Sequence, residues 1–229
     1  YSAEKERSVG LGVMGFHSYL QQHNIPLESV MSKAWNKKIF KHIQEHVDQA
    51  SKDLADERGA CPDAADYGFN ERFSNKTAIA PTASISIICG GASPGVEPVA
   101  ANSYTHKTLS GSFNVRNRYV IELLEKHGKN TEEVWSGITT NQGSVSHLDF
   151  LTDLEKDVFK TAFELDQKWI IELSGDRTPF ISQAQSINLF VPADIHKREL
   201  HKIHFDAWKK GLKSLYYCRS KSIQRAENV

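Results

Sequence analysis

One stretch of the chain has the residue types that could hold a phosphate. It places a proline, two hydroxyl side chains and small neighbours directly after a short apolar run at residues 77–80. This pattern is typical of a helix start, where hydroxyls and backbone N–H groups without intrahelical acceptors can bind an anion. It is equally typical of a helix start that is merely capped, so the residues alone leave both interpretations open. The stretch consists of Pro81, Thr82, Ala83, Ser84 and Ile85.

A pair of adjacent tyrosines, Tyr216 and Tyr217, has the residue type for a different chemistry. A phenol can lose an electron and a proton together, so two neighbouring phenols can pass on an oxidising equivalent. Adjacent tyrosines at the end of a helix are also common in simple packing, with each hydroxyl hydrogen-bonded. The residues alone therefore leave radical transfer and packing open.

A glycine-rich segment near the start, residues 10–15, matches the G-x-G-x-x-G dinucleotide fingerprint. That fingerprint works only after a strand, which delivers the pyrophosphate to a helix N-terminus. Only nine residues precede Gly10, and several of them are charged. We therefore expect glycines that allow tight packing rather than a nucleotide site.

Histidines at helical spacing raise the question of a metal site. Residues 42–46, His-Ile-Gln-Glu-His, match an inverted zinc-peptidase pattern. The apolar stripe of this helix, however, places His42 and His46 on its flank and Glu45 nearly opposite the stripe. A catalytic glutamate has to face the same cleft as its histidines, so we expect a solvated flank and no metal site. His201 and His204, in a lysine-rich helix, receive the same interpretation.

The elements that must position these residues follow from periodicity. Apolar residues at three- and four-residue steps predict four helices, and short apolar runs ending near prolines predict two strands. The stretch at residues 90–117 is rich in Gly and Pro and predicts a long functional loop. Alternating strands and helices indicate an α/β architecture. The predicted helices span residues 29–54, 118–127, 154–173 and 195–215, and the strands span 77–80 and 186–190.

Composition limits the class of protein. The 229 residues contain 28 Lys plus Arg and 28 Asp plus Glu, a balance that argues against a nucleic-acid binder. The apolar runs are far shorter than a membrane span, and three scattered cysteines do not make a disulfide framework, so we expect a cytoplasmic protein. The start is polar and lacks a methionine, and we expect the chain to be a segment of something longer.

Four stretches together resemble the large (α) subunit of class I ribonucleotide reductase. They occur in the order of that family and span almost the whole chain, which makes the set far more specific than any one motif. The resemblance implies the C-terminal part of a ten-stranded α/β barrel over residues 1–215. Residues 216–229 would carry the tyrosine pair and the start of a C-terminal tail. The four stretches are residues 7–15, 75–86, 185–190 and 211–220.

The resemblance also implies a reaction, the conversion of ribonucleoside diphosphates to 2′-deoxyribonucleoside diphosphates by radical chemistry for DNA synthesis. Residues 81–85 resemble the loop that holds the substrate diphosphate, and Tyr216 and Tyr217 resemble the radical-transfer pair. The resemblance further implies that the radical comes from a separate metal-containing β subunit and that a thioredoxin- or glutaredoxin-type protein supplies the electrons. This chain itself is expected to bind no cofactor or metal, no nucleic acid and no membrane.

Parts of the family's site have no counterpart here. The radical cysteine with its asparagine and glutamate would lie upstream, Cys61 resembles a structural position, and Cys89 lacks a partner for a reducing pair. We therefore expect the chain alone to be inactive and to need the N-terminal part of the subunit. The chain is expected to be either a separately encoded half of the subunit, as in a phage-type split subunit, or a fragment of a full-length subunit. The alternatives are an adenosylcobalamin-dependent reductase fragment and a non-catalytic interaction module of the same fold.

Overall fold

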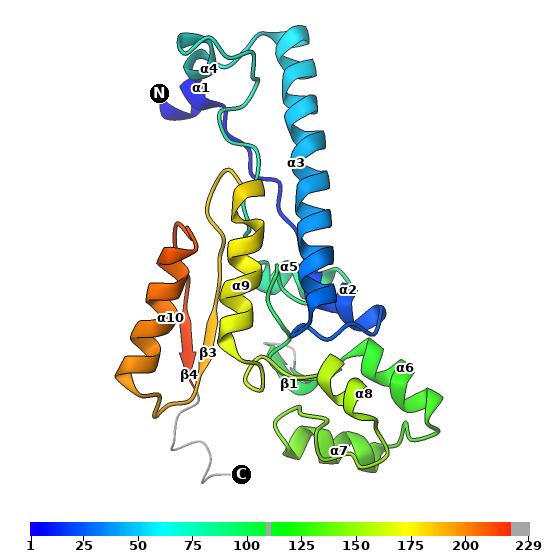
Figure 1. The fold of residues 1–229 in the computed structure, drawn as a ribbon. Coiled ribbons are helices and arrows are strands. Elements are labelled where there is room, and N and C mark those ends of the chain that lie inside the picture. Colours follow the sequence, from blue (N-terminus) through cyan, green and yellow to red (C-terminus); the bar gives the residue numbers. More distant parts are fainter. Residues whose placement is uncertain (109–110, 221–229) are drawn as a thin grey trace.

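The computed structural model describes residues 1–108 and 111–220, which form ten α-helices, one short 3-10 helix and four strands within that part of the chain (Figure 1). The helices are α1 (Ser2–Glu6), α2 (Phe16–Gln22), α3 (Val30–Arg58), α4 (Pro62–Asp66), α5 (Ala83–Ile88), α6 (Arg118–Lys126), α7 (Glu132–Thr140), α8 (Asp153–Val158), α9 (Gln167–Arg177), η1 (Thr178–Phe180) and α10 (Lys197–Lys209). The strands are β1 (Ser103–Thr108), β2 (Gly111–Arg116), β3 (Leu189–Val191) and β4 (Cys218–Ser220).

Four extended segments run parallel and lie side by side in one row. Leu11 bridges Thr77, Ile79 bridges Gln185, and β3 pairs with β4, each in parallel. The segment at residues 184–191 is central, because it bonds Ile79 through Ala184 and Ser186 on one side and residues 216–217 through Ile187 and Leu189 on the other. Parallel strands joined by helices confirm the predicted α/β architecture.

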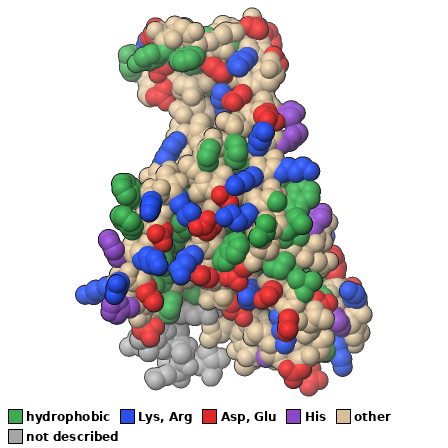
Figure 2. All heavy atoms as spheres, in the orientation of Figure 1, with side chains coloured by type: hydrophobic (Ala, Val, Ile, Leu, Met, Phe, Trp, Pro, Cys, Tyr) green, Lys and Arg blue, Asp and Glu red, His purple; other side chains and the backbone are tan. Residues whose placement is uncertain are grey.

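Three hydrophobic cores stabilise the described part of the chain, and the smallest of them lies between α9, β3 and α10. The largest core packs α2, α3 and α9 against the parallel segments, with Phe16, Leu20, Phe40 and Ile187 among its buried residues. A separate core holds α6, α7 and α8 together around the buried side chain of Trp135, at the lower right of Figure 1. On the face that Figure 2 shows, basic and acidic side chains are interspersed, and no extended basic patch is visible there.

Two of the four predicted helices are confirmed almost to their ends. Helix α3 starts after Ser29, whose hydroxyl accepts a hydrogen bond from Ser32 N, and it runs four residues beyond the predicted end. Helix α6 starts after Asn117, whose side chain caps Tyr119 N, and Gly128 follows its end with a φ of 64°. Both helices begin at the side-chain cap that their sequences provide.

The prediction of one helix over residues 154–173 is wrong. Helix α8 ends at Val158, and α9 begins only after Asp166, which caps Lys168 N. Between them, the Glu164 carboxylate accepts hydrogen bonds from the backbone N–H and the hydroxyl of Thr161 and so stabilises a turn. The apolar residues of this turn are buried at helix-like spacing without forming a helix, which explains the error.

Two further predictions need correction. Helix α10 ends at Lys209, and Gly211 follows with a φ of 78°, so the predicted extension to residue 215 is wrong. Part of the predicted loop at 90–117 is the antiparallel hairpin β1–β2. The first four residues of β2 are exposed, so the hairpin lacks the alternating apolar pattern that marks a half-buried strand.

Over the described residues, no helix is both long and apolar enough to cross a membrane. The beginning of the predicted tail, at residues 221–229, lies outside the described residues.

Candidate functional site

The first part of the site is the start of α5. The first helical hydrogen bond runs from Ser86 N to Thr82 O, so the amides of Ala83, Ser84 and Ile85 have no acceptor within the helix. The side chains of these three residues are exposed. The predicted helix start is therefore confirmed, and its amides and the Ser84 hydroxyl can reach a ligand from outside this chain.

Thr82 caps this helix without the usual side-chain bond. Its backbone lies in the left-handed region, with φ 51° and ψ 27°, and its hydroxyl oxygen accepts a hydrogen bond of 2.8 Å from Gly95 N. Gly95 has a φ of 49°, and a Cβ there would lie 2.9 Å from Ala80 O, so only glycine fits this approach. The hydroxyl proton of Thr82 stays available, because the oxygen acts here only as an acceptor.

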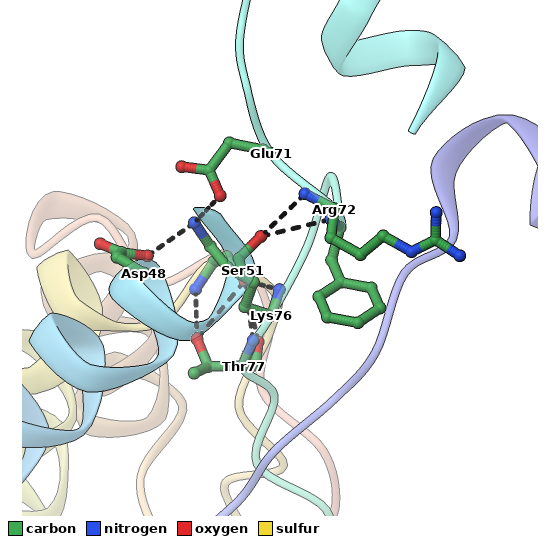
Figure 3. Close-up of polar contacts among 8 residues, drawn as sticks. Asp48, Ser51, Glu71, Arg72, Lys76 and Thr77 are labelled. Atoms are coloured by element: carbon green, nitrogen blue, oxygen red, sulfur yellow. Dashed lines mark hydrogen bonds and ion pairs between the residues drawn. The ribbon is translucent and has the colours of Figure 1, made fainter. Parts of the chain in front are cut away.

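The segment that leads into α5 is anchored to α3 by a polar cluster (Figure 3). Lys76 Nζ lies 2.6 Å from Asp48 and 3.2 Å from Glu71. Burial alone would lower the pKa of Lys76, but the hydrogen bonds to these two carboxylates outweigh it and raise the pKa. Ser182 adds a second anchor, since its hydroxyl oxygen accepts from the backbone N–H groups of Lys76 and Thr77. This cluster positions the backbone five residues before Thr82.

The second part of the site is the tyrosine pair. The ring centroids of Tyr216 and Tyr217 are 4.1 Å apart at an interplanar angle of 52°. Tyr216 N donates to Ile187 O at 2.8 Å, and Leu189 N donates to Tyr217 O at 2.9 Å, so the pair continues the pairing of β4 with β3. The strand pairing therefore holds both backbones while the rings remain near half exposed, at 48% and 54%.

The two phenols interact directly. The neighbouring Tyr217 side chain raises the pKa of Tyr216. The Arg219 guanidinium lies 5.6 Å from the centroid of the Tyr217 ring. Two phenols in contact, with a cation beside one of them, can exchange a proton and an electron between each other, and their exposed rings can contact a further redox group.

Glu97 and Asn188 connect the two parts, and the sequence analysis did not identify them as site residues. The Glu97 carboxylate accepts hydrogen bonds from Asn188 N at 3.1 Å and from Asn188 Nδ2 at 3.0 Å. Asn188 Oδ1 in turn accepts from Tyr217 N at 3.0 Å. Burial raises the pKa of Glu97, although the hydrogen bonds from Asn188 and the charge of Arg219 act in the opposite direction. An acid between two prolines in an apolar stretch, residues 94–99, was the available signal.

The glycine-rich segment at 10–15 is a packing element, as the sequence analysis expected. Leu11 forms a parallel bridge with Thr77, and a Cβ at Gly12 would lie 2.4 Å from Ala78 O. The glycine therefore allows two backbones to approach closely. No strand delivers a ligand to α2 here, because α1 is the element that precedes the segment.

The histidine pairs are exposed, as expected. The rings of His42 and His46 are in contact, tilted at 45° with 4.1 Å between their centroids, and Glu45 pairs with Lys41. His201 and His204 are exposed on α10. Over residues 1–108 and 111–220, no group of three or more His, Cys, Asp or Glu side chains could hold a metal ion.

The cysteines of the described chain are free thiols. Cys61 is fully buried at the start of α4, which agrees with its interpretation as a structural residue, whereas Cys89 and Cys218 are exposed.

Comparisons with known proteins agree with this architecture. The family model "Ribonucleotide reductase, barrel domain" matches residues 1–71 and 64–218. Proteins named ribonucleoside-diphosphate reductase large subunit from Invertebrate iridescent virus 6 and Invertebrate iridescent virus 3 are 50% and 45% identical over the whole chain. The solved structure of the Actinobacillus ureae class Id ribonucleotide reductase alpha subunit matches 99% of the chain with a TM-score of 0.89 at 40% identity.

The parallel segments, the helices that join them and the match to a solved alpha subunit define this chain as a portion of an α/β barrel domain. The chain belongs to the ribonucleotide reductase barrel-domain family. It covers 24% and 36% of the two viral relatives' lengths and 41% of the solved alpha subunit.

Proposed function

We propose that this chain is the C-terminal portion of a ribonucleoside-diphosphate reductase large subunit. Its contribution is to hold the substrate's diphosphate and to deliver a radical during the conversion of ribonucleoside diphosphates to deoxyribonucleoside diphosphates. The family match and the relatives named as large subunits of this reductase support the proposal. The observation that carries it is the tyrosine pair, whose rings are in contact and exposed beside β3 and β4.

The start of α5 is the proposed diphosphate site. Three amides without intrahelical acceptors, together with the hydroxyls of Thr82 and Ser84, supply donors for phosphate oxygens. Hydrogen bonds to charged groups are shorter and about twice as strong as neutral ones. The link between Thr82 and Gly95 and the anchor at Lys76 hold these donors in place before the substrate arrives.

Tyr216 and Tyr217 are the proposed route for the radical. Within this chain, the 4.1 Å ring contact brings the two phenols close enough to pass on an electron, and each phenol carries the proton that moves with it. The exposure of both rings leaves them open to neighbours outside this chain on either side.

The other components of the reaction lie outside this chain. We propose that the N-terminal part of the large subunit supplies the radical cysteine and the reducing cysteine pair. A metal-containing β subunit generates the radical, and a thioredoxin- or glutaredoxin-type protein restores the thiols. We propose a cytoplasmic location, where such thiol reductants operate.

The proposal for the diphosphate site is tested in the complete large subunit by Thr82→Ala and Ser84→Ala, separately and together. Each lost hydrogen bond to a phosphate oxygen is expected to cost on the order of 1.5–3 kcal/mol of binding free energy. Equilibrium dialysis with a ribonucleoside diphosphate measures this. An unchanged dissociation constant in the double variant means that the helix start is only capped.

The proposal for the tyrosine pair is tested by Tyr216→Phe and Tyr217→Phe in the same complete enzyme with its β subunit. Phenylalanine keeps the ring but lacks the phenolic proton and is much harder to oxidise. We expect turnover to be abolished and substrate binding to stay nearly intact, the pattern of a lost reaction step. Near-normal turnover in either variant would favour the adenosylcobalamin-dependent reductase, which needs no tyrosine relay.

A non-catalytic interaction module with the same fold is the remaining alternative. Co-expression with an N-terminal part of the large subunit discriminates between the two. A portion of the enzyme associates with that partner and restores activity, whereas a module of this kind is a stable monomer without it.

A further inference from the structure

Glu97 is a buried acid to which the proposed reaction assigns no role. Its side chain is 6% exposed, and both of its oxygens accept hydrogen bonds from a single residue, Asn188. A buried carboxylate is costly unless it is fully hydrogen-bonded, so its retention at this place calls for an explanation.

On one side, Glu97 is joined to the proposed diphosphate site. The turn at residues 94–97 is closed by a hydrogen bond from Glu97 N to Pro94 O at 2.9 Å. Within this turn, Gly95 N donates to the hydroxyl oxygen of Thr82 at 2.8 Å, and Gly95 cannot carry a Cβ because of Ala80 O. A displacement of Thr82 is therefore transmitted to Glu97 through a single closed turn.

On the other side, Glu97 is joined to the radical-transfer pair. Asn188 is held by the carboxylate through both its backbone N–H and its side-chain amide, which fixes its rotamer. The oxygen of the same side-chain amide, Asn188 Oδ1, accepts a hydrogen bond from Tyr217 N at 3.0 Å. Arg219, whose charge acts on Glu97, also lies against the Tyr217 ring. The orientation of Asn188, and with it the backbone position of Tyr217, depends on Glu97.

We propose that Glu97 and Asn188 are positioning residues that couple occupancy of the diphosphate site at Thr82 to the placement of Tyr217. This inference rests on the proposed function of both parts. A bound diphosphate draws on the Thr82 hydroxyl and on the amides next to it, so it stabilises the turn at 94–97 and the contacts beyond it. The radical pair is then held in its transfer geometry when substrate is present, which limits radical loss in its absence.

The test combines hydrogen exchange with turnover in the complete large subunit and its β subunit, with cytidine diphosphate as the probe. In the parent enzyme, the probe is expected to slow exchange at residues 82–85 and also at residues 215–218. The slowing at 215–218 is expected to be about two- to tenfold, the effect of one hydrogen bond between neutral groups, here from Tyr217 N to Asn188 Oδ1. Glu97→Gln places an amide against the donors of Asn188 and is expected to remove the slowing at 215–218 only.

A paired substitution separates coupling from simple stability. Asn188→Asp alone places a second carboxylate against that of Glu97, and this variant is also expected to lose the slowing of exchange at 215–218. In the double variant Glu97→Gln with Asn188→Asp, the new amide donates to the new carboxylate, whose other oxygen still accepts from Tyr217 N. We expect the double variant to regain both the exchange response and the turnover. Glu132→Gln, which removes an exposed carboxylate paired with Arg116, is the matched control and should behave as the parent.

The outcomes are distinguishable. If the probe slows exchange at 215–218 equally in the parent and in both single variants, the coupling is refuted, while the functions of Thr82 and Tyr217 stand. If both single variants lose turnover and the double variant does not regain it, Glu97 and Asn188 have only a structural role. If the probe leaves residues 82–85 unprotected, or Tyr217→Phe retains turnover, the proposed function fails and this inference fails with it.

Discussion

Acid should destabilise helix α2 through one residue, His17. Its imidazole is 1% exposed, and burial lowers its pKa from 6.5 to about 4. Its Nδ1 accepts a hydrogen bond from Val99 N at 3.1 Å, and its Nε2 has no partner. A second proton would have to go to Nδ1, where it would face the N–H of Val99. His17 therefore stays neutral in the folded chain down to a pH of about 4, whereas in the unfolded chain it is protonated with its usual pKa of 6.5.

The sign and size of the effect follow from linkage. As the pH falls below 6.5, the unfolded state gains a proton that the folded state does not, so stability falls until the pH reaches about 4 and then levels off. The full loss is about 3 kcal/mol, and the loss between pH 7.5 and pH 5 is about 2 kcal/mol. That loss corresponds to a roughly thirtyfold increase in the opening equilibrium of α2.

Hydrogen exchange of the α2 amides in the complete large subunit, corrected for the intrinsic rate at each pH, measures this opening. His17→Asn keeps an acceptor for Val99 N but cannot titrate, so its α2 should be less stable at neutral pH yet nearly independent of pH down to 5. His201→Asn, at an exposed histidine on α10, should keep the parent's pH dependence. The reasoning is refuted if His17→Asn shows the same acid-induced opening as the parent.

Three other substitutions test the packing and capping that position the site, each by equilibrium unfolding. Gly12→Ala brings a Cβ to 2.4 Å from Ala78 O and should lower the free energy of unfolding by at least about 1–3 kcal/mol. Gly10→Ala brings a Cβ only to 3.3 Å from the Ala78 side chain and should lower it less. Thr152→Ala removes the capping box of α8 and should cost about 1 kcal/mol, with Thr152→Ser close to neutral. Arg177→Met leaves three buried acceptors of the guanidinium unpaired and should lower the free energy of unfolding by more than about 3 kcal/mol. Arg177→Lys should not restore this stability, since lysine lacks the planar, forked guanidinium that reaches all three acceptors.

The sequence was sufficient to predict a helix where a capping residue, an apolar periodicity and a residue that ends the helix occur together. Helix α3 follows the capping serine Ser29, and α6 lies between the capping Asn117 and Gly128. The helix start after Pro81 was predictable for the same reason, since proline and small hydroxylated residues mark it in the sequence. The same reasoning failed over residues 154–173, because apolar residues buried in two separate cores, on either side of the turn at 159–166, recur at a helix-like spacing.

Contacts between distant residues could not be predicted in this way. Glu97 and Asn188 are 91 positions apart, and neither one's neighbours indicate the other. The exposed faces of the tyrosine rings depend on the pairing of β4 with β3, which brings together segments separated by α10. The sequence could thus name Tyr216 and Tyr217 through the family resemblance, whereas the link between them and the diphosphate site required the fold.

The central claim is that a radical passes through the tyrosine pair, and electron paramagnetic resonance tests it most directly. The complete large subunit would carry 3-aminotyrosine, which is easier to oxidise than tyrosine, in place of Tyr217, and would be mixed with its radical-bearing β subunit and cytidine diphosphate. The account predicts an aminotyrosyl radical that appears as the radical of the β subunit decays. Decay or persistence of the β radical with no new signal from position 217 would contradict it.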